Sequence, residues 1–170
     1  MKKYVLLLNL VFLFSLNAFA QNPNFSAEWM LDKEKSKLDE RLSASIESQS
    51  LKVEQGDKNI KVTVTTKSSG NQGGVDIGGG TNTYPLDGKE FNSETETQIG
   101  RVFLTFKGEI KDGKLHLQSV RKFNTPNGEV TLMTKEVWDL SADGKTLTIK
   151  RESEAQRGKV SSELVFTKKT

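Results

Sequence analysis

The sequence predicts an all-β protein, an antiparallel up-and-down meander of about eight to ten strands that closes into a barrel. Apolar and polar residues alternate in runs bounded by Gly, Asp and Asn, which is typical of strands and hairpins. In the C-terminal half, one register carries through consecutive hairpins and leaves one face apolar. Because a slip of one residue would turn a strand's apolar side chains to the other face, this agreement favours a single sheet. Closing that sheet covers the apolar face and removes its edges.

The first residues have the layout of a secretory signal peptide. Two lysines precede an apolar run that ends at Leu16, and Ala18-Phe19-Ala20 then offers a small-x-small cleavage site. The run is too short to span a membrane as a helix. We therefore expect residues 1–20 to be a signal peptide cleaved after Ala20, and residues 21–170 to be a single secreted or periplasmic domain with no integral membrane span.

Composition excludes several classes of function. The chain has no Cys, which removes disulfides, thiol nucleophiles and a lipidated cysteine anchor. It has 25 basic and 22 acidic residues, and loss of Lys2 and Lys3 with the leader leaves 23 basic residues, so the mature chain is close to neutral. A nucleic-acid partner would need a basic stripe, which is missing. With His116 as the one histidine, we expect no metal site, no cofactor and no catalytic residues.

The N-terminal half contains the less regular strands. The Gly56-Asp57-Lys58 turn joins two of them and is expected to place Val53 opposite Ile60. The glycine-rich stretch 68–80 is expected to be a loop at the barrel rim, and Pro85 suggests an edge position for the strand that follows. The expected strands are 25–31, 45–55, 59–67 and 81–86, with a polar, weakly defined segment at 91–99.

The C-terminal half contains the best-defined strands, at 101–110, 114–123, 129–140, 145–153 and 159–168. Turns at Asp112-Gly113, Pro126-Asn127-Gly128, Asp143-Gly144 and 157–158 set their pairing. The expected opposite pairs are Ile110 with Leu115, Phe106 with Ser119, Leu104 with Arg121, Phe123 with Val130, Leu140 with Leu147, Ile149 with Leu164, and Leu147 with Phe166.

The other face of the predicted sheet is charged. A membrane barrel would have to present these charges to lipid, so an outer-membrane porin is excluded. The outward positions include Lys107, Glu109, Lys135, Lys150, Glu152 and Glu163.

Three segments resemble secreted bacterial lipocalin-like proteins of the calycin superfamily. They are Ala27-Glu28-Trp29-Met30-Leu31 with Lys35-Ser36-Lys37-Leu38, then Tyr84-Pro85-Leu86-Asp87-Gly88-Lys89-Glu90, and Glu136-x-Trp138-x-Leu140-Ser141-x-Asp143-Gly144-Lys145-Thr146-Leu147. The resemblance implies a lipocalin-like barrel whose closed end is plugged by Trp29. In that superfamily a late Arg or Lys crosses over the Trp, which here could be Arg151, Lys168 or neither. Many such proteins have no assigned activity.

A polar patch interrupts the inner, apolar face. It consists of Ser119, Arg121, Thr134, Glu136, Arg151 and Ser162. Glu136 faces Arg151 in the predicted register, so Arg121 is a surplus positive charge that suits an acidic headgroup such as a carboxylate. Leu104, Phe106, Leu117, Leu132 and Ile149 would hold an apolar tail. We expect these residues to bind a small hydrophobic or amphipathic ligand, or to form a structural ion-pair network in a filled barrel.

A different class of function stays open. A protein-interaction or inhibitor module would have a filled barrel and would use the 68–80 loop and the 91–99 segment. An enzyme is the weakest hypothesis because no nucleophile–base arrangement is visible. We expect a monomer, and we expect Trp138 to belong to the core.

Overall fold

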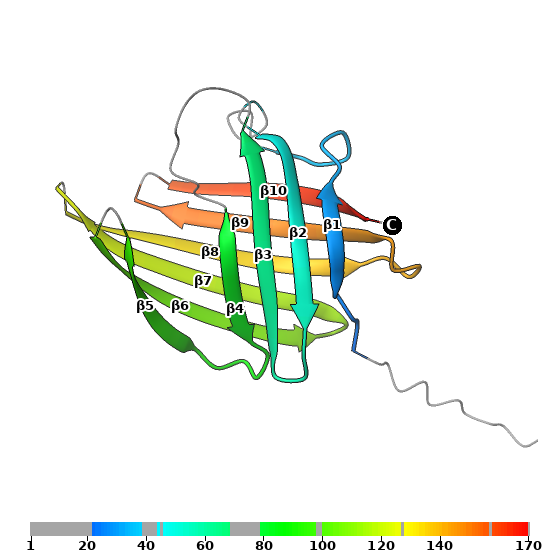
Figure 1. Ribbon diagram of the computed structural model, residues 1–170, viewed down its shortest axis with the longest axis horizontal. Coiled ribbons are helices and arrows are strands. Elements are labelled where there is room, and N and C mark those ends of the chain that lie inside the picture. The colour runs from blue at the N-terminus through cyan, green and yellow to red at the C-terminus, as the bar shows by residue number, and fades with distance from the viewer. Residues whose placement is uncertain are drawn as a thin grey trace, which may run out of the picture.

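The computed structural model describes residues 22–38, 44, 46–68, 79–97, 100–126, 128–156 and 158–169, and the expected signal peptide lies outside them. These residues form an all-β chain, which confirms the predicted fold class (Figure 1). The strands are β1 (Ala27–Leu31), β2 (Ile46–Gln55), β3 (Asn59–Ser68), β4 (Gly80–Pro85), β5 (Phe91–Thr97), β6 (Gly100–Lys111), β7 (Lys114–Thr125), β8 (Gly128–Leu140), β9 (Thr146–Ala155) and β10 (Gly158–Lys168).

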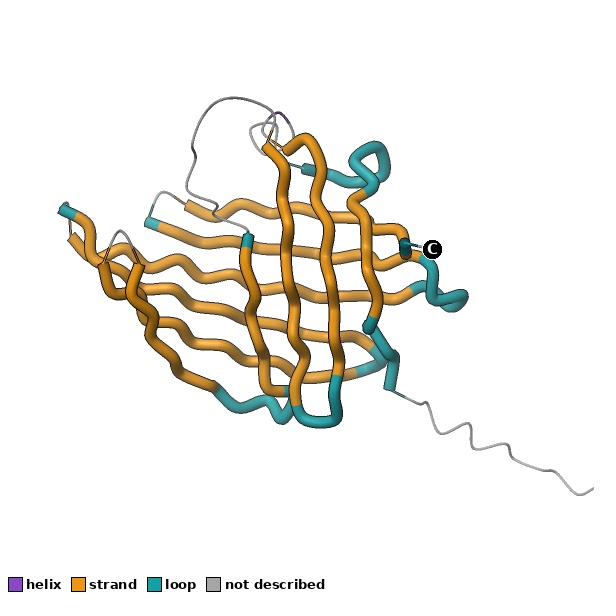
Figure 2. The backbone as a smooth tube through the Cα atoms, viewed as in Figure 1, coloured by secondary structure: helices purple, strands orange, loops and turns teal. Residues whose placement is uncertain are grey.

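All ten strands belong to one antiparallel sheet with the order β4-β3-β2-β1-β10-β9-β8-β7-β6-β5. Each strand therefore pairs with its neighbours in sequence, except that β4 and β5 are the two edges of the sheet and do not pair with each other, and β1 also pairs with β10. Figure 2 shows that β1–β4 run across β5–β10, so the sheet folds over itself into two walls. This is the predicted up-and-down meander, and it forms a nearly closed barrel.

The barrel closes where the segment after β4 meets β6. Gly88 N donates to Gly108 O at 3.0 Å, and Asp87 forms an isolated bridge with Glu109. A Cβ on Gly108 would lie 2.6 Å from Pro85 O, so only glycine permits this approach. The rest of β6 pairs with β5, whose seven residues are all exposed, so the barrel is open on that side of Gly108.

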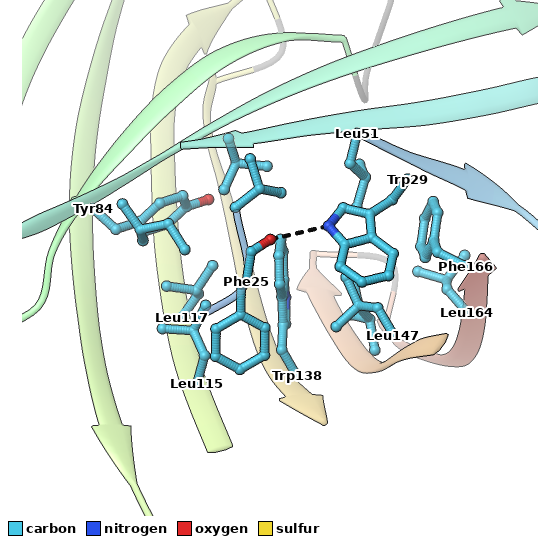
Figure 3. Close-up of a cluster of buried hydrophobic side chains, with 14 of the residues drawn as sticks. Phe25, Trp29, Leu51, Tyr84, Leu115, Leu117, Trp138, Leu147, Leu164 and Phe166 are labelled. Atoms are coloured by element: carbon cyan, nitrogen blue, oxygen red, sulfur yellow. Dashed lines mark hydrogen bonds between the residues drawn. The ribbon is translucent and has the colours of Figure 1, made fainter. Parts of the chain in front are cut away.

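The closed half is filled by a buried apolar cluster (Figure 3). Phe25 and Trp138 meet edge to face, with 6.2 Å between ring centroids. The indole nitrogen of Trp29 donates to Phe25 O at 3.0 Å, so this buried polar atom is satisfied. Trp138 is 1% exposed, which confirms the prediction that it belongs to the core.

The predicted register is confirmed throughout the C-terminal half. Each expected pair is observed: Ile110–Leu115, Phe106–Ser119, Leu104–Arg121, Phe123–Val130, Leu140–Leu147, Ile149–Leu164 and Leu147–Phe166. On the outer face, Lys135 lies opposite Glu152 and Lys150 lies opposite Glu163, as the alternation requires. The two positive φ angles of Asp112 (52°) and Gly113 (71°) identify the twisted two-residue turn that fixes the β6–β7 register.

The expected pairing of β2 with β3 was wrong by two residues. Val53 pairs with Val62, and Ile60 pairs with Gln55. The hydrogen bond from Gly56 N to Asn59 O (2.9 Å) closes the hairpin one residue later than the Gly56-Asp57-Lys58 turn implied. Because a shift of two residues keeps each side chain on its face, the apolar inner face is unchanged.

Gly108→Ala is expected to destabilise the protein. The added methyl group would contact Pro85 O (2.6 Å) and the Leu117 side chain (3.1 Å), so β4 must move away from β6. We expect the free energy of unfolding in urea to fall by roughly 1–3 kcal/mol. Gly56→Ala is the matched control, because its new Cβ would meet only ordinary contacts at 3.7 Å. Equal stability of the two variants would contradict this closure.

Candidate functional site

Cross-strand neighbours on the inner face of β6–β10 line up in rows, four of which we name by their content. The core row is Ile110, Leu115, Trp138, Ile149 and Leu164. The ion-pair row is Gly108, Leu117, Glu136, Arg151 and Ser162. The hydroxyl row is Phe106, Ser119, Thr134, Ser153 and Val160, and the arginine row is Leu104, Arg121 and Leu132.

The ion-pair row contains a carboxylate with both oxygens occupied. Glu136 Oε1 accepts a hydrogen bond from Arg151 Nε at 2.6 Å, and Oε2 accepts one from the Trp138 indole at 2.7 Å. The Glu136 side chain is 12% exposed and that of Arg151 is 27% exposed. The predicted pair therefore forms, and Trp138 is a partner that the sequence analysis missed. Its position two residues from Glu136 on the same face of the strand is the signal that could have identified it.

Tyr84 brings a buried hydroxyl from β4 to the same region. Its ring meets Phe106 edge to face at 5.2 Å. Burial raises the pKa of Tyr84 well above 10.0, and the nearby negative charge of Glu136 raises it further. The hydrogen bond between Tyr84 and Ser119 lowers this pKa, as do the positive charges of Arg121 and Arg151, but these effects are smaller. Sequence reasoning missed this residue because β4 follows the 68–80 stretch, where no short turn sets the register.

Arg121 is separated from the ion pair. It is partly buried between Leu104 and Leu132, its cross-strand neighbours in the arginine row. Leu132 lies four residues before Glu136 in β8, a backbone distance of roughly 13 Å. Arg121 makes no ion pair or hydrogen bond with any residue that the structure describes. The two predicted arginines thus belong to different rows, and only Arg151 is bound to Glu136, although the charges of both act on Tyr84.

The predicted hydroxyl groups lie between these charges. Ser119 and Thr134 face each other in the hydroxyl row, and Ser162 lies opposite Arg151. Thr134 also approaches Ser153, with 3.4 Å between their hydroxyl oxygens. All six predicted residues are on the inner face and partly buried. Ser153 also belongs to the hydroxyl row, opposite Thr134. It was not one of the six predicted residues, although the predicted register placed it on the inner face.

The inner face beyond the ion-pair row has uncovered apolar side chains. Phe91, opposite Phe106, is 54% exposed, and Val160, opposite Ser153, is 43% exposed, whereas Leu115 and Ile149 of the core row are 0% exposed. We call this part of the inner face the open trough. Phe91 and Val160 are exposed, Leu104, Phe123, Val130 and Leu132 are partly buried, and Val102, opposite Phe123, is buried.

Arg121 belongs to this trough by its position in the arginine row. Two hollows on the described part of the chain lie elsewhere. One, of about 440 Å³, is open to solvent at the β2–β3 hairpin beside Ser26, and the other, of about 30 Å³, lies on the outer face between Lys135 and Lys159. The expected tail residues divide accordingly. Leu117, Phe106 and Ile149 are buried in the core, Leu104 is partly buried and packs against that core, and Leu132 is partly buried in the trough.

Trp29 lies in the closed half, where it is 1% exposed. Lys168 is its cross-strand neighbour, but its side chain is exposed, and Arg151 is paired with Glu136. Among the described residues, neither cation stacks on the Trp29 ring. In the described part of the chain, neither Arg151 nor Lys168 therefore crosses over Trp29, which was the third of the three possibilities.

Two further properties concern the described residues. They contain no group of three or more His, Cys, Asp or Glu side chains that could hold a metal ion. No helix among them has the length and apolar character needed to cross a membrane.

Comparison with known proteins shows a distant structural likeness. The sequence matches no protein-family model, and no curated protein matches it. Among solved structures, the chain is similar to the zebrafish ileal bile acid-binding protein complexed with cholic acid. The two share 14% sequence identity over 86% of this chain and 98% of that chain, with a TM-score of 0.47. A likeness this remote says nothing about the ligand or the activity of this chain.

Glu136→Gln is expected to destabilise the protein, because a carboxamide offers one acceptor where the carboxylate now accepts from both Arg151 and Trp138. We expect the free energy of unfolding to fall by roughly 1–3 kcal/mol. Glu152→Gln is the matched control on the outer face, where the exposed pair with Lys159 contributes little. If both variants lost the same stability in urea denaturation, the ion pair would not be a structural centre of the barrel.

Tyr84 is expected to make stability depend on alkaline pH. Because its folded pKa is raised, the neutral phenol stabilises the fold fully below pH 10.0, and this contribution is lost as the unfolded chain ionises at higher pH. The unfolding free energy should then fall by up to about 1.4 kcal/mol per pH unit above pH 10, in excess of the fall in Tyr84→Phe. Identical slopes for the two proteins would show that Tyr84 is not shielded from water.

Proposed function

We propose that this protein is a non-enzymatic binding protein for a small amphipathic acid, which it holds in the open trough. The observation that carries the proposal is Arg121, a partly buried cation whose cross-strand neighbours are leucines and which has no partner among the described residues. A buried or partly buried charge is costly unless it is paired, so the trough favours a molecule that supplies an anion. Guanidinium groups bind carboxylates in a bidentate manner.

The surrounding side chains give the ligand its apolar half. Leu104 and Leu132 flank Arg121, and Phe91 and Val160 leave much of their surface uncovered. Burying such surface against a hydrocarbon chain is favourable, at about 25 cal/mol per Å². Ser119 and Thr134, one row further in, offer hydroxyls to a headgroup. Arg151 and Glu136 satisfy each other, so in this proposal they support the trough and Arg121 is the anchor.

Export from the cell is a further part of the proposal, and it rests on the leader-like residues 1–20. The fold is compatible with cleavage after Ala20. The Gln55 side chain accepts from Phe25 N (2.9 Å) and donates to Pro23 O (3.1 Å), so the described structure uses residues from Pro23 onward. That the protein acts as a monomer is a further part of the proposal.

A second candidate is the protein-interaction module, which β5 favours. This strand is at the edge of the sheet, is exposed along its length, and covers most of the 91–99 segment. An extended segment of another protein could add to such an edge. Most of the 68–80 loop lies outside the described residues. The protein-interaction module becomes the favoured function if Arg121→Met binds the acidic fluorescent probe as well as the natural chain does.

The proposed function is tested by two fluorescent probes that differ in one charged group. 1-Anilinonaphthalene-8-sulfonate is acidic, whereas N-phenyl-1-naphthylamine has the same aromatic body and is neutral. We expect Arg121→Met to weaken binding of the acidic probe by roughly tenfold to a hundredfold in a fluorescence titration, and to leave the neutral probe nearly unchanged.

Lys122→Met is the matched control, because Lys122 is the next residue of β7, is exposed and points to the outer face. It removes the same charge without touching the trough. Equal losses in both variants would show that the acidic probe responds to net charge alone. Full binding by Arg121→Met would overturn the proposed role of Arg121.

A further inference from the structure

Gln49 is a buried amide in β2, on the wall of the barrel opposite β7. It lies on the inner face of β2, in alternation with Leu51 and Val53, and it is 5% exposed. Its Nε2 donates to Thr66 Oγ1 on β3 at 3.0 Å. Its Oε1 is buried without a hydrogen-bond partner, and among the described residues no other buried side-chain polar atom is in this condition.

The Gln49 side chain lacks one hydrogen-bond partner whichever way its amide group is turned. If the oxygen and nitrogen exchanged places, the Thr66 hydroxyl would donate to the oxygen, and the nitrogen would lose its partner instead. One polar atom of Gln49 is therefore unpaired in either orientation. Such atoms are rare in folded proteins and reduce stability, and binding a ligand is one way to satisfy them.

Gln49 and Arg121 belong to opposite walls of the same barrel. Gln49 is in β2 of the β1–β4 wall, and Arg121 is in β7 of the β5–β10 wall, both on the inner face (Figure 1). Both lack a full set of partners, but their chemistry differs. Arg121 requires an anion, whereas the Gln49 amide requires a neutral group that can donate or accept a hydrogen bond. A hydroxyl meets that second requirement in either orientation of the amide.

We propose that the ligand is an amphipathic acid that also carries a hydroxyl group, and that the Gln49 amide is the subsite for this hydroxyl. The inference rests on the proposed function, because it takes the acid to be bound at Arg121. It narrows the ligand class from any amphipathic acid to hydroxylated ones. The discrimination comes from the amide, which is left unpaired when a plain hydrocarbon chain occupies the interior.

The test compares hexadecanoic acid with a set of its monohydroxylated derivatives, in which the hydroxyl moves stepwise along the chain. Binding is measured by displacement of N-phenyl-1-naphthylamine from the full chain. We expect at least one derivative to bind about tenfold more tightly than hexadecanoic acid. Gln49→Leu should abolish this preference while leaving the affinity for hexadecanoic acid unchanged. Arg121→Met should weaken both acids equally and keep the preference.

Gln118→Leu is the matched control, since Gln118 lies on the outer face of β7 between Lys107 and Lys135 and should not affect the preference. Thermal unfolding checks the fold of Gln49→Leu, which should be at least as stable as the natural chain because it removes an unpaired amide. Acid binding without preference for any hydroxylated derivative would overturn the inference, as would a preference that survives in Gln49→Leu.

Failure of the proposed function gives a different result. If no acid binds, the role of Arg121 is lost, and the neutral alcohol hexadecanol decides the role of Gln49. Binding of hexadecanol that falls about tenfold in Gln49→Leu would support the hydroxyl subsite on its own. Hexadecanol binding that is absent, or equal in the natural chain and Gln49→Leu, would overturn it.

Discussion

The interior of this barrel depends on how the charge of Glu136 is satisfied. A carboxylate with 12% of its side chain exposed needs partners, and it has one for each oxygen, Arg151 at 2.6 Å and the Trp138 indole at 2.7 Å. Trp138 also belongs to the buried core row, so the ion pair is joined to the packed core of the molecule. Because Arg151 is already engaged, Arg121 is the cation on the inner face that has no partner among the described residues. In the proposed binding site, Arg121 is therefore the residue that binds the acid group of the ligand.

Closure at Gly108 divides the barrel into two halves with different physical character. On one side of this contact, aromatic and aliphatic residues fill the interior around Phe25 and Trp138. On the other side, β6 pairs with the exposed strand β5, and the inner-facing Phe91 is 54% exposed. One half of the barrel is therefore filled by side chains, and the other half is the one proposed to bind the ligand. The structural ion pair lies at their boundary, and the proposed ligand lies beyond it.

Sequence reasoning predicted most of the fold because short turns carry register information. The Asp112-Gly113 turn needs two positive φ angles, which its residues adopt, so every pair along β6 and β7 follows from it. The Gly56–Asn59 turn allowed more than one pairing, and the prediction there was wrong by two residues. Alternation placed the six candidate residues on the inner face. It could not show that Glu136 binds Trp138, that Tyr84 approaches Ser119, or that Gln49 is left unpaired, because these depend on side-chain packing and on a strand after the long 68–80 stretch.

The central claim is that Arg121 holds the acid group while Glu136 and Arg151 hold each other. A crystal structure of the protein grown with hexadecanoic acid tests this most directly. We predict a carboxylate oxygen within hydrogen-bonding distance of the Arg121 guanidinium, the hydrocarbon chain between Leu104 and Leu132, and an unchanged bond from Arg151 to Glu136. A carboxylate bound to Arg151 with Glu136 displaced, or an acid on the outer face with Arg121 unoccupied, would contradict the claim.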